Sequence, residues 1–268
     1  MKAGFVQFDP IFGEVDKNID KATRLIEPLD ADLIVLPEFF NTGYLFTSRQ
    51  EAADLAEAIP DGPTTKALCD VARRKNMHLV GGLIEKEGDR LYNAAVLISP
   101  RGHLGTYRKV HLFNEETLWF NPGDKGFEVY DIGLCKLGIM ICFDWIFPEA
   151  MRVLALKGAD VVCHPANLVL PFCQDAMITR CLENRVFAVT ANRTGTEQRG
   201  SKTFRYTGRS QITGPAANIL YRAGADTEET GVVKVDVSLA RNKRLNPYND
   251  LFADRRIAFY GALTGRVN

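Results

Sequence analysis

The sequence predicts a single domain of the α/β class. Segments with helical spacing of apolar residues alternate along the chain with short apolar runs typical of buried strands. No stretch rich in Pro, Gly or Ser and no block of like charges divides the 268 residues. A chain of this length can bury a large core without disulfides or metals. We therefore interpret residues 1–268 as one domain.

The first half of the chain predicts two helices among several strands. Apolar residues at positions 15, 19, 22, 25, 26 and 29 have helical spacing, and the apolar run 32–36 ends at Pro37 as a buried strand does. Residues 86–89 and 100–102 have the composition of hairpin turns. The predicted strands are 2–8, 32–36, 78–84, 91–98 and 104–110, and the predicted helices are 15–29 and 63–77.

The second half continues the alternation. Gly133 separates two strands, and Gly158 closes a helix as a C-terminal stop. The predicted strands are 127–132, 136–141, 160–163, 187–190, a region near 208–222, and 231–237, and the predicted helices are 148–157 and 174–185. The polar, glycine-containing segment 195–206 is predicted to be a surface loop. From Ser238 onward we expect an extended arm with a short helix.

Composition excludes several classes of partner. Lys plus Arg and Asp plus Glu both number 33, so the net charge of zero gives no reason to expect nucleic acid or an anionic membrane. No 18-residue apolar stretch is present, and the N-terminus reaches Asp9 too soon for a secretory signal. We expect a soluble, cytoplasmic protein with neither nucleic acid nor membrane as a partner.

The six cysteines are predicted to be free thiols. No two of them form a C-x-x-C pair, and without a signal peptide a disulfide framework is not expected. They stand at positions 69, 135, 142, 163, 173 and 181. The four histidines, at 78, 103, 111 and 164, show no metal-ligand spacing, so no zinc site is predicted.

Three strand ends carry residues whose side chains can take part in catalysis: Glu38, Lys109 and Cys142. Taken singly, each has an ordinary structural explanation as a solvated charge or a core thiol. The segments 31–38 and 159–166 also echo each other, since both open with Ala-Asp and contain a Pro. This echo suggests two similar strand ends meeting at one edge of a sheet, where functional residues of α/β proteins collect.

Together the three residues form a coherent set. A thiol is a nucleophile only as its thiolate, so it needs a base or a positive neighbour. A carboxyl group in an apolar pocket has a raised pKa and serves as a general base near neutral pH. A lysine ammonium can stabilise negative charge that develops on the substrate. Cys142, Glu38 and Lys109 therefore supply nucleophile, base and electrophilic stabiliser.

The sequence resembles the nitrilase superfamily of carbon–nitrogen hydrolases, in particular its short single-domain members. The resemblance runs from the first strand to about Tyr260, and the order and spacing of its short motifs are highly specific. The matching segments are Leu36-Pro37-Glu38, Tyr107-Arg108-Lys109-Val110-His111-Leu112-Phe113, Phe120-Asn121-Pro122-Gly123-Asp124, Ile141-Cys142-Phe143-Asp144, Phe147-Pro148-Glu149 and His164-Pro165-Ala166-Asn167.

The resemblance implies a catalytic triad of Glu38, Lys109 and Cys142. It also implies a second glutamate after the lysine motif, for which the spacing favours Glu116 over Glu115. Cys142 would attack, Lys109 and the backbone N–H of Phe143 would hold the oxyanion, and Glu38 would move the protons. Neither cofactor nor metal is implied.

The implied architecture is a four-layer α-β-β-α sandwich. Each chain would contribute a two-layered sheet core flanked by helices, and chains would pair through helices into a homodimer or a higher homo-oligomer. The C-terminal arm, about 240–268, is expected at the dimer interface, with a segment such as 242–260 crossing to the partner.

The substrate is expected to be a small-molecule amide or nitrile. Cys142-Phe143-Asp144 is more similar to amidases and carbamoylases than to true nitrilases, so an amidase is favoured, and an aliphatic nitrilase and an N-carbamoyl amidohydrolase stay open. Arg152 lies inside a predicted helix and is a poor partner for a carbamoyl substrate's carboxylate. Tyr44, Trp145, Asn167 and Phe143 are expected to bind substrate, with loops 41–50, 113–121 and 168–176 shaping the pocket. An acyl transferase and a silent binding module are the alternatives outside hydrolysis.

Two rival chemistries rank lower. A Cys–His dyad could pair Cys142 with His111 or His164, but the resemblance assigns the base to glutamate. The segment 195–203 nearly matches a phosphate-binding loop, yet Ser201 separates the Gly and Lys that this motif requires to be adjacent. The chain has no G-x-S-x-G sequence, which argues against a serine α/β-hydrolase.

Overall fold

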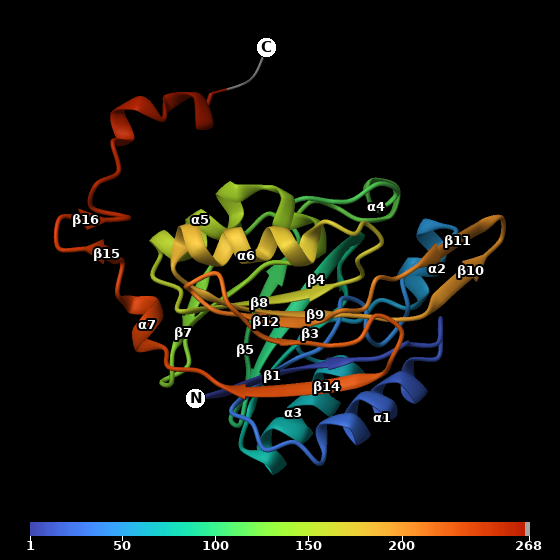
Figure 1. Ribbon diagram of the computed structural model, residues 1–268. Helices are drawn as coiled ribbons and strands as arrows, with labels where there is room; N and C mark the ends of the chain where they lie inside the picture. Colours follow the sequence, from blue (N-terminus) through green and yellow to red (C-terminus); the bar gives the residue numbers. More distant parts are fainter. Residues whose placement is uncertain (266–268) are drawn as a thin grey trace.

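The computed structural model describes residues 1–265, in which two six-stranded sheets pack against each other (Figure 1). The first sheet has the strand order β14-β1-β2-β3-β4-β5, with parallel pairing only at β1–β2 and β2–β3. Its strands are β1 (Lys2–Gln7), β2 (Leu33–Val35), β3 (His78–Glu87), β4 (Arg90–Ser99), β5 (Gly102–Arg108) and β14 (Glu229–Lys234).

The second sheet has the order β13-β12-β9-β8-β7-β6, with β7, β8 and β9 running parallel. Its strands are β6 (Val129–Asp131), β7 (Lys136–Ile139), β8 (Val161–Ala166), β9 (Phe187–Asn192), β12 (Gln211–Thr213) and β13 (Ile219–Arg222). Strands β1, β2 and β3 of the first sheet contact β8 and β9 of the second. The parallel strands of the two sheets therefore face each other at the centre of the molecule.

Helices cover the outer face of each sheet. In Figure 1, α1 (Val15–Ile26) and α3 (Pro63–Lys75) lie below the first sheet, and α5 (Pro148–Leu156) and α6 (Cys173–Asn184) lie above the second. The predicted α-β-β-α sandwich is confirmed, and one chain contains all four layers.

Strand β2 shows how the sequence produces these layers. Successive side chains of a strand point to opposite faces. Leu33 and Val35 pack into the core between the sheets, whereas Ile34 packs into the core beneath α1 and α3. Because both faces are covered, the strand is apolar throughout and shows no alternation.

Several predicted boundaries change in the structure. Helix α1 ends at Ile26, earlier than the predicted end at residue 29, because Pro28 has no N–H group to continue the helical hydrogen bonds. The predicted loop 113–121 contains the short helix α4 (Glu116–Trp119), and the short helix α2 (Arg49–Asp54) begins at the end of the predicted loop 41–50.

The prediction of a loop at 195–206 is wrong. Strands β10 (Thr196–Arg199) and β11 (Lys202–Arg205) form an antiparallel hairpin around Gly200 and Ser201. Gly200 has φ +59°, which a tight hairpin turn requires and glycine adopts without strain. The polar composition concealed the strands, since the inward-facing residue of β10 is itself charged: Glu197 is buried and pairs with Arg193.

The C-terminal segment extends away from the sandwich (Figure 1). It contains α7 (Ser238–Arg241), the pair β15 (Arg244–Asn246) and β16 (Asn249–Asp250), and two 3₁₀ turns, η2 (Ile257–Phe259) and η3 (Gly261–Leu263). The expected extended arm with a short helix is confirmed as far as residue 265, and the last residues of the predicted arm, 266–268, lie outside the described residues. Within residues 1–265, no helix is long and apolar enough to cross a membrane.

Candidate active site

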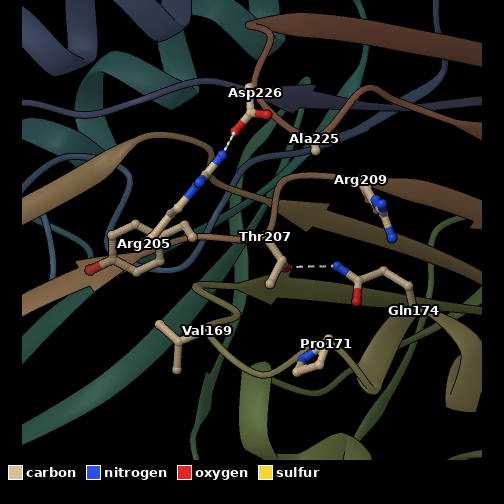
Figure 2. A pocket seen from close by; sticks show the side chains of 9 residues that line it. Val169, Pro171, Gln174, Arg205, Thr207, Arg209, Ala225 and Asp226 are labelled. Carbon is tan, nitrogen blue, oxygen red and sulfur yellow. Dashed lines mark hydrogen bonds and ion pairs between the residues drawn. The ribbon is translucent and has the colours of Figure 1, made fainter.

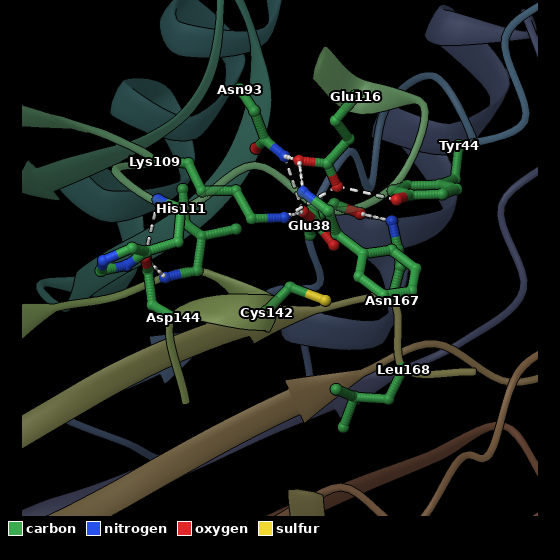
Figure 3. Close-up of polar contacts among 12 residues, drawn as sticks. Glu38, Tyr44, Asn93, Lys109, His111, Glu116, Cys142, Asp144, Asn167 and Leu168 are labelled. Atoms are coloured by element: carbon green, nitrogen blue, oxygen red, sulfur yellow. Dashed lines mark hydrogen bonds and ion pairs between the residues drawn. The ribbon is translucent and has the colours of Figure 1, made fainter. Parts of the chain in front are cut away.

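Cys142 occupies a strained turn after β7. It is the first residue of the 3₁₀ helix η1 (Cys142–Ile146) and has φ +42°, a left-handed conformation that costs a non-glycine residue about 1–3 kcal/mol. Asp144 stabilises this turn, because its Oδ2 accepts hydrogen bonds from the Ile141 N–H at 2.9 Å and the Tyr107 hydroxyl at 2.6 Å. The turn aims the thiol away from the strand, toward Asn167 and Glu38 (Figure 3).

Glu38 follows β2 and is fully buried. Its Oε1 accepts hydrogen bonds from Lys109 Nζ at 2.8 Å and from Asn93 Nδ2 at 2.6 Å. Its Oε2 has no hydrogen-bond partner among residues 1–265. Strand β3 approaches the Glu38 backbone so closely that a Cβ on Gly82 would lie 2.5 Å from the Glu38 Cα, so this position requires glycine.

Lys109 follows β5 and links two carboxylates. Its Nζ donates to Glu38 Oε1 and to Glu116 Oε1, both at 2.8 Å, and its side chain is fully buried. Burial alone would lower the pKa of Lys109, but the carboxylates of Glu116 and Glu38 outweigh it and raise that pKa above its ordinary value. An ammonium group has three N–H donors, and these two bonds leave the third for another acceptor.

The structure places Glu116, and not Glu115, beside Lys109. The Glu116 side chain is 3% exposed, and its Oε1 also accepts a hydrogen bond from the Tyr44 hydroxyl at 2.7 Å. The Glu115 side chain is 36% exposed and pairs with Lys202 at the surface. Burial, together with the like charge of Glu38, raises the pKa of Glu116 despite the lysine beside it.

Sequence reasoning missed Asn93, which lies in β4 between the two carboxylates. Its Nδ2 donates to Glu38 Oε1 at 2.6 Å and to Glu116 Oε2 at 3.3 Å (Figure 3). A polar amide inside the otherwise apolar strand 91–98 is the feature that could have identified it. The amide holds both carboxylates in place without adding charge.

The two similar strand ends do lie close together, but the prediction that they share one sheet is wrong, because β2 belongs to the first sheet and β8 to the second. Asn167, just after β8, donates its side-chain N–H to the backbone oxygen of Glu38 at 2.8 Å. Asn167 also lines the same pocket as Cys142. The end of β8 therefore joins the glutamate of one sheet to the cysteine of the other.

The Cys142 side chain is a protonated thiol near neutral pH. Burial first, and then the negative charge of Glu38, raise the pKa of Cys142 well above its ordinary value, and Lys109 offsets only part of this rise. Attack on a substrate therefore requires a base that removes the thiol proton during the reaction. The unpartnered Glu38 Oε2 lies in this buried cluster.

The two histidines beside the motifs contact groups other than the Cys142 thiol. His164 Nε2 lies 2.9 Å from the backbone oxygen of Cys142, and burial lowers the pKa of His164 to about 4. His111 Nδ1 lies 2.7 Å from Asp144 Oδ1. Both rings thus support the turn that carries Cys142. All six cysteines are free, as predicted, and residues 1–265 contain no cluster of His, Cys, Asp and Glu suited to a metal.

The thiol of Cys142 opens into a narrow pocket in front of the sulfur. The lining residues are Phe113, Cys142, Phe143, Trp145, Asn167, Leu168, Val169 and Leu170. Three of the four residues expected to bind substrate, Phe143, Trp145 and Asn167, line it. The fourth, Tyr44, lines a separate cavity beside Glu116 and contacts the site through its hydroxyl group.

The different environments of the two neighbouring glutamates lead to a prediction. Glu116→Gln removes a negative charge that orients Lys109, so kcat/KM should fall about 100-fold. Glu115→Gln removes only a partly exposed ion pair and should change kcat/KM by less than about twofold. Steady-state kinetics of both variants on one substrate checks this, and equal losses would contradict the assignment.

Comparison with known proteins agrees with this geometry. A sequence model described as Carbon-nitrogen hydrolase matches residues 2–245. A nitrilase from Pyrococcus abyssi is 51% identical over 97% of this chain and 99% of its own length. An (R)-stereoselective amidase from a Pseudomonas species is 32% identical over 98% of this chain and 94% of its own. The crystal structure of a carbon-nitrogen hydrolase from Helicobacter pylori G27 superposes with a TM-score of 0.91 at 26% identity, covering 100% of this chain and 99% of the other. The order of the motifs, the buried Glu–Lys–Cys cluster and these similarities establish that the chain belongs to the carbon-nitrogen hydrolase family.

Proposed function

We propose that the protein hydrolyses a small-molecule amide to a carboxylic acid and ammonia through a thioester on Cys142. One observation supports this proposal above all: around the thiol, the buried cluster retains one unused acceptor and one unused donor. Glu38 Oε2 has no partner among the described residues, and Lys109 uses two of its three N–H groups. Amide hydrolysis requires a proton acceptor and an oxyanion donor beside the nucleophile.

In the first half-reaction the Cys142 sulfur bonds to the carbonyl carbon while its proton moves to Glu38 Oε2. The carbonyl π electrons move to oxygen, and this oxyanion accepts hydrogen bonds from Lys109 Nζ and the backbone N–H of Phe143. Phe143 lies in the first turn of η1, where N–H groups lack partners within the helix. The C–N bond then breaks, the nitrogen takes the proton from Glu38, and ammonia leaves.

The second half-reaction repeats these roles with water as the nucleophile. Water transfers a proton to Glu38 as its oxygen attacks the thioester carbon, and the same two donors hold the oxyanion. The C–S bond breaks, the Cys142 sulfur regains its proton from Glu38, and the acid leaves. Glu116 keeps Lys109 charged and oriented throughout, because its Oε1 contacts Lys109 Nζ.

A nitrile is the second candidate substrate, and the similarity to the Pyrococcus abyssi nitrilase favours it. The same thiol would add to the nitrile carbon, giving a thioimidate in place of the first tetrahedral intermediate. Loss of ammonia after addition of water would lead to the same thioester. Lys109 and Glu38 have equivalent roles in both routes, so substrate trials must separate them.

The test is ammonia release from a panel of aliphatic amides, aromatic amides, ω-amides, N-carbamoyl compounds and nitriles, with the Glu38→Gln variant assayed beside the wild-type protein. We expect ammonia and acid from amides, and at least a 10³-fold lower kcat in the variant, because glutamine cannot accept the thiol proton. Glu115→Gln is the control for loss of a carboxylate.

Each other outcome has a defined meaning. Ammonia from nitriles but not from amides would move the function to nitrilase. Hydroxamate as the main product when hydroxylamine is present at low concentration would indicate an acyl transferase. Wild-type activity in Glu38→Gln would contradict the proposed mechanism.

We also propose that two copies of the chain pair through helices and C-terminal arms. The arm exposes large apolar side chains that a partner could cover: Leu245, Tyr248, Ile257, Phe259, Tyr260 and Leu263. Contiguous exposed apolar groups of this kind mark protein interfaces. Lys243, which donates to the backbone oxygens of Asn184 and Arg185, anchors the start of the arm at the end of α6.

A further inference from the structure

We infer that the acyl part of the substrate is small, apolar and uncharged. This inference rests on the proposed function, because it takes the carbon attacked by Cys142 as the fixed point. The reacting carbonyl or nitrile group must face Lys109 and Glu38, so the acyl chain has to extend into the narrow pocket in front of the sulfur. The lining of that pocket therefore decides which acyl chains are accepted.

The walls of the pocket offer almost no polar group. Apart from Cys142 and Asn167, every lining side chain is aliphatic or aromatic: Phe113, Phe143, Trp145, Leu168, Val169 and Leu170. The Asn167 side-chain N–H donates to the backbone oxygen of Glu38, and its Oδ1, which has no hydrogen-bond partner among residues 1–265, is the one neutral acceptor that this side chain offers. An ammonium or carboxylate group on the acyl chain would enter this space without a partner of opposite charge among the lining residues, and an unpaired charge in apolar surroundings is strongly disfavoured.

The cations near the pocket are already engaged. Arg180 donates to the backbone oxygen of Trp145 and pairs with Glu183. Lys202 pairs with Glu115 at 2.6 Å. Inside the site, two carboxylates face a single ammonium, Lys109, so the cluster cannot neutralise a further anion. An anionic acyl chain is thus disfavoured for two reasons: the walls of the pocket are apolar, and the two carboxylates and one ammonium near the sulfur carry a net negative charge.

A larger cavity of about 450 Å³ lies next to this pocket and contains arginines (Figure 2). Val169 lines both spaces and lies between them. Arg205 in that cavity pairs with Asp226 at 3.0 Å, and Arg209 is the remaining cation there. If a charged acyl chain reached this cavity past Val169, Arg209 would be the residue that received it.

The experiment compares acyl chains of one size and different charge. Butyramide, succinamate and β-alaninamide share a chain in which methyl, carboxylate or ammonium occupies the end, and butyronitrile, 3-cyanopropanoate and 3-aminopropionitrile form the matching nitrile series. We expect kcat/KM for the uncharged member to exceed that of either charged member at least about 100-fold. A charged member within about tenfold of the uncharged one would overturn the inference.

Two variants test whether the lining of the pocket causes the discrimination between charged and uncharged acyl chains. Leu170→Arg places a cation at the exposed edge of the pocket and should raise kcat/KM for succinamate relative to butyramide at least about tenfold. Arg209→Ala is the control and should leave that ratio unchanged. If Arg209→Ala lowers the ratio, the neighbouring cavity receives the acyl chain and the inference fails.

A second measurement needs no turnover and separates this inference from the proposed function. Iodoacetamide and iodoacetate alkylate thiols with an uncharged and an anionic group, respectively. The ratio of the alkylation rate by iodoacetamide to that by iodoacetate is measured at Cys142, by mass spectrometry of its peptide, and for free cysteine. We expect the ratio at Cys142 to be at least about 100-fold higher than the ratio for free cysteine. If no substrate releases ammonia but this preference holds, the proposed function fails and the pocket chemistry stands. If this rate ratio is the same for Cys142 and for free cysteine, the inference fails even when the enzyme is active.

Discussion

Cys142→Ala is expected to reduce turnover at least about 10⁴-fold while the protein stays folded. The substitution removes the nucleophile, and the remaining donors can only bind the substrate, which leaves a small residual rate. The substitution removes none of the hydrogen bonds that hold the turn, because Asp144 accepts its hydrogen bond from the backbone N–H of Ile141 and not from the Cys142 side chain. Ammonia release, measured together with thermal unfolding, checks both parts of this prediction.

The matched control is Cys163→Ala. Cys163 is fully buried in β8 and belongs to the same hydrophobic core, but within residues 1–265 it forms no hydrogen bond or ion pair with Glu38, Lys109 or Cys142. This variant should lose about 1–2 kcal/mol of stability through the smaller side chain and keep kcat within about twofold. Wild-type turnover in Cys142→Ala would reject the nucleophile assignment outright.

Lys109→Ala is expected to have the largest effect on stability as well as a loss of activity. It leaves two buried carboxylates, Glu38 and Glu116, without their shared cation, and breaking a buried ion pair in this way costs about 3–5 kcal/mol. Loss of the oxyanion donor should lower kcat at least about 10²–10³-fold. Chemical denaturation and kinetics of the same preparation measure the two effects separately.

The stability deficit of Lys109→Ala should depend on pH in one direction. Burial and the charge of Glu38 raise the pKa of Glu116, and removing the ammonium raises it further. A group whose pKa is raised in the folded state stabilises that state when protonated, and this contribution is lost as pH rises through the folded-state pKa. The deficit relative to the wild-type protein should therefore shrink as pH falls from 7 toward about 5.

Two further variants control this prediction. Lys86→Ala removes an exposed lysine at the end of β3 and should change stability by less than about 0.5 kcal/mol. The double variant Lys109→Met, Glu116→Gln removes one charge of each sign, so it should recover part of the lost stability but none of the activity. A Lys109→Ala protein with wild-type stability at every pH would show that the three charges do not form one coupled cluster.

The pattern of the sequence was sufficient to predict the α/β class and most helices and strands, and the family resemblance supplied their arrangement in layers. Apolar runs such as Leu33-Ile34-Val35 occur because both faces of the central strands are covered, and this constraint is local enough to read from composition and length. The hairpin at 196–205 escaped prediction because its inward-facing Glu197 is stabilised by Arg193 and by the backbone of Leu45, partners that are distant or not evident in the sequence. Buried and exposed positions alternate along that hairpin, but the residue types do not alternate between apolar and polar in the same way.

The sequence by itself also determined the chemical inventory: a carboxylate, an ammonium and a thiol at the ends of apolar strands. Only the tertiary structure decided how they are used. Adjacent helical residues point about 100° apart, so the direction of α4 selects Glu116 over Glu115. Asn93, the free oxygen of Glu38 and the uncharged pocket depend on contacts between residues far apart in the chain, such as Lys109 and Glu38. These contacts arise where the strand ends of two facing sheets come together, and local sequence preferences carry no information about how the sheets pack.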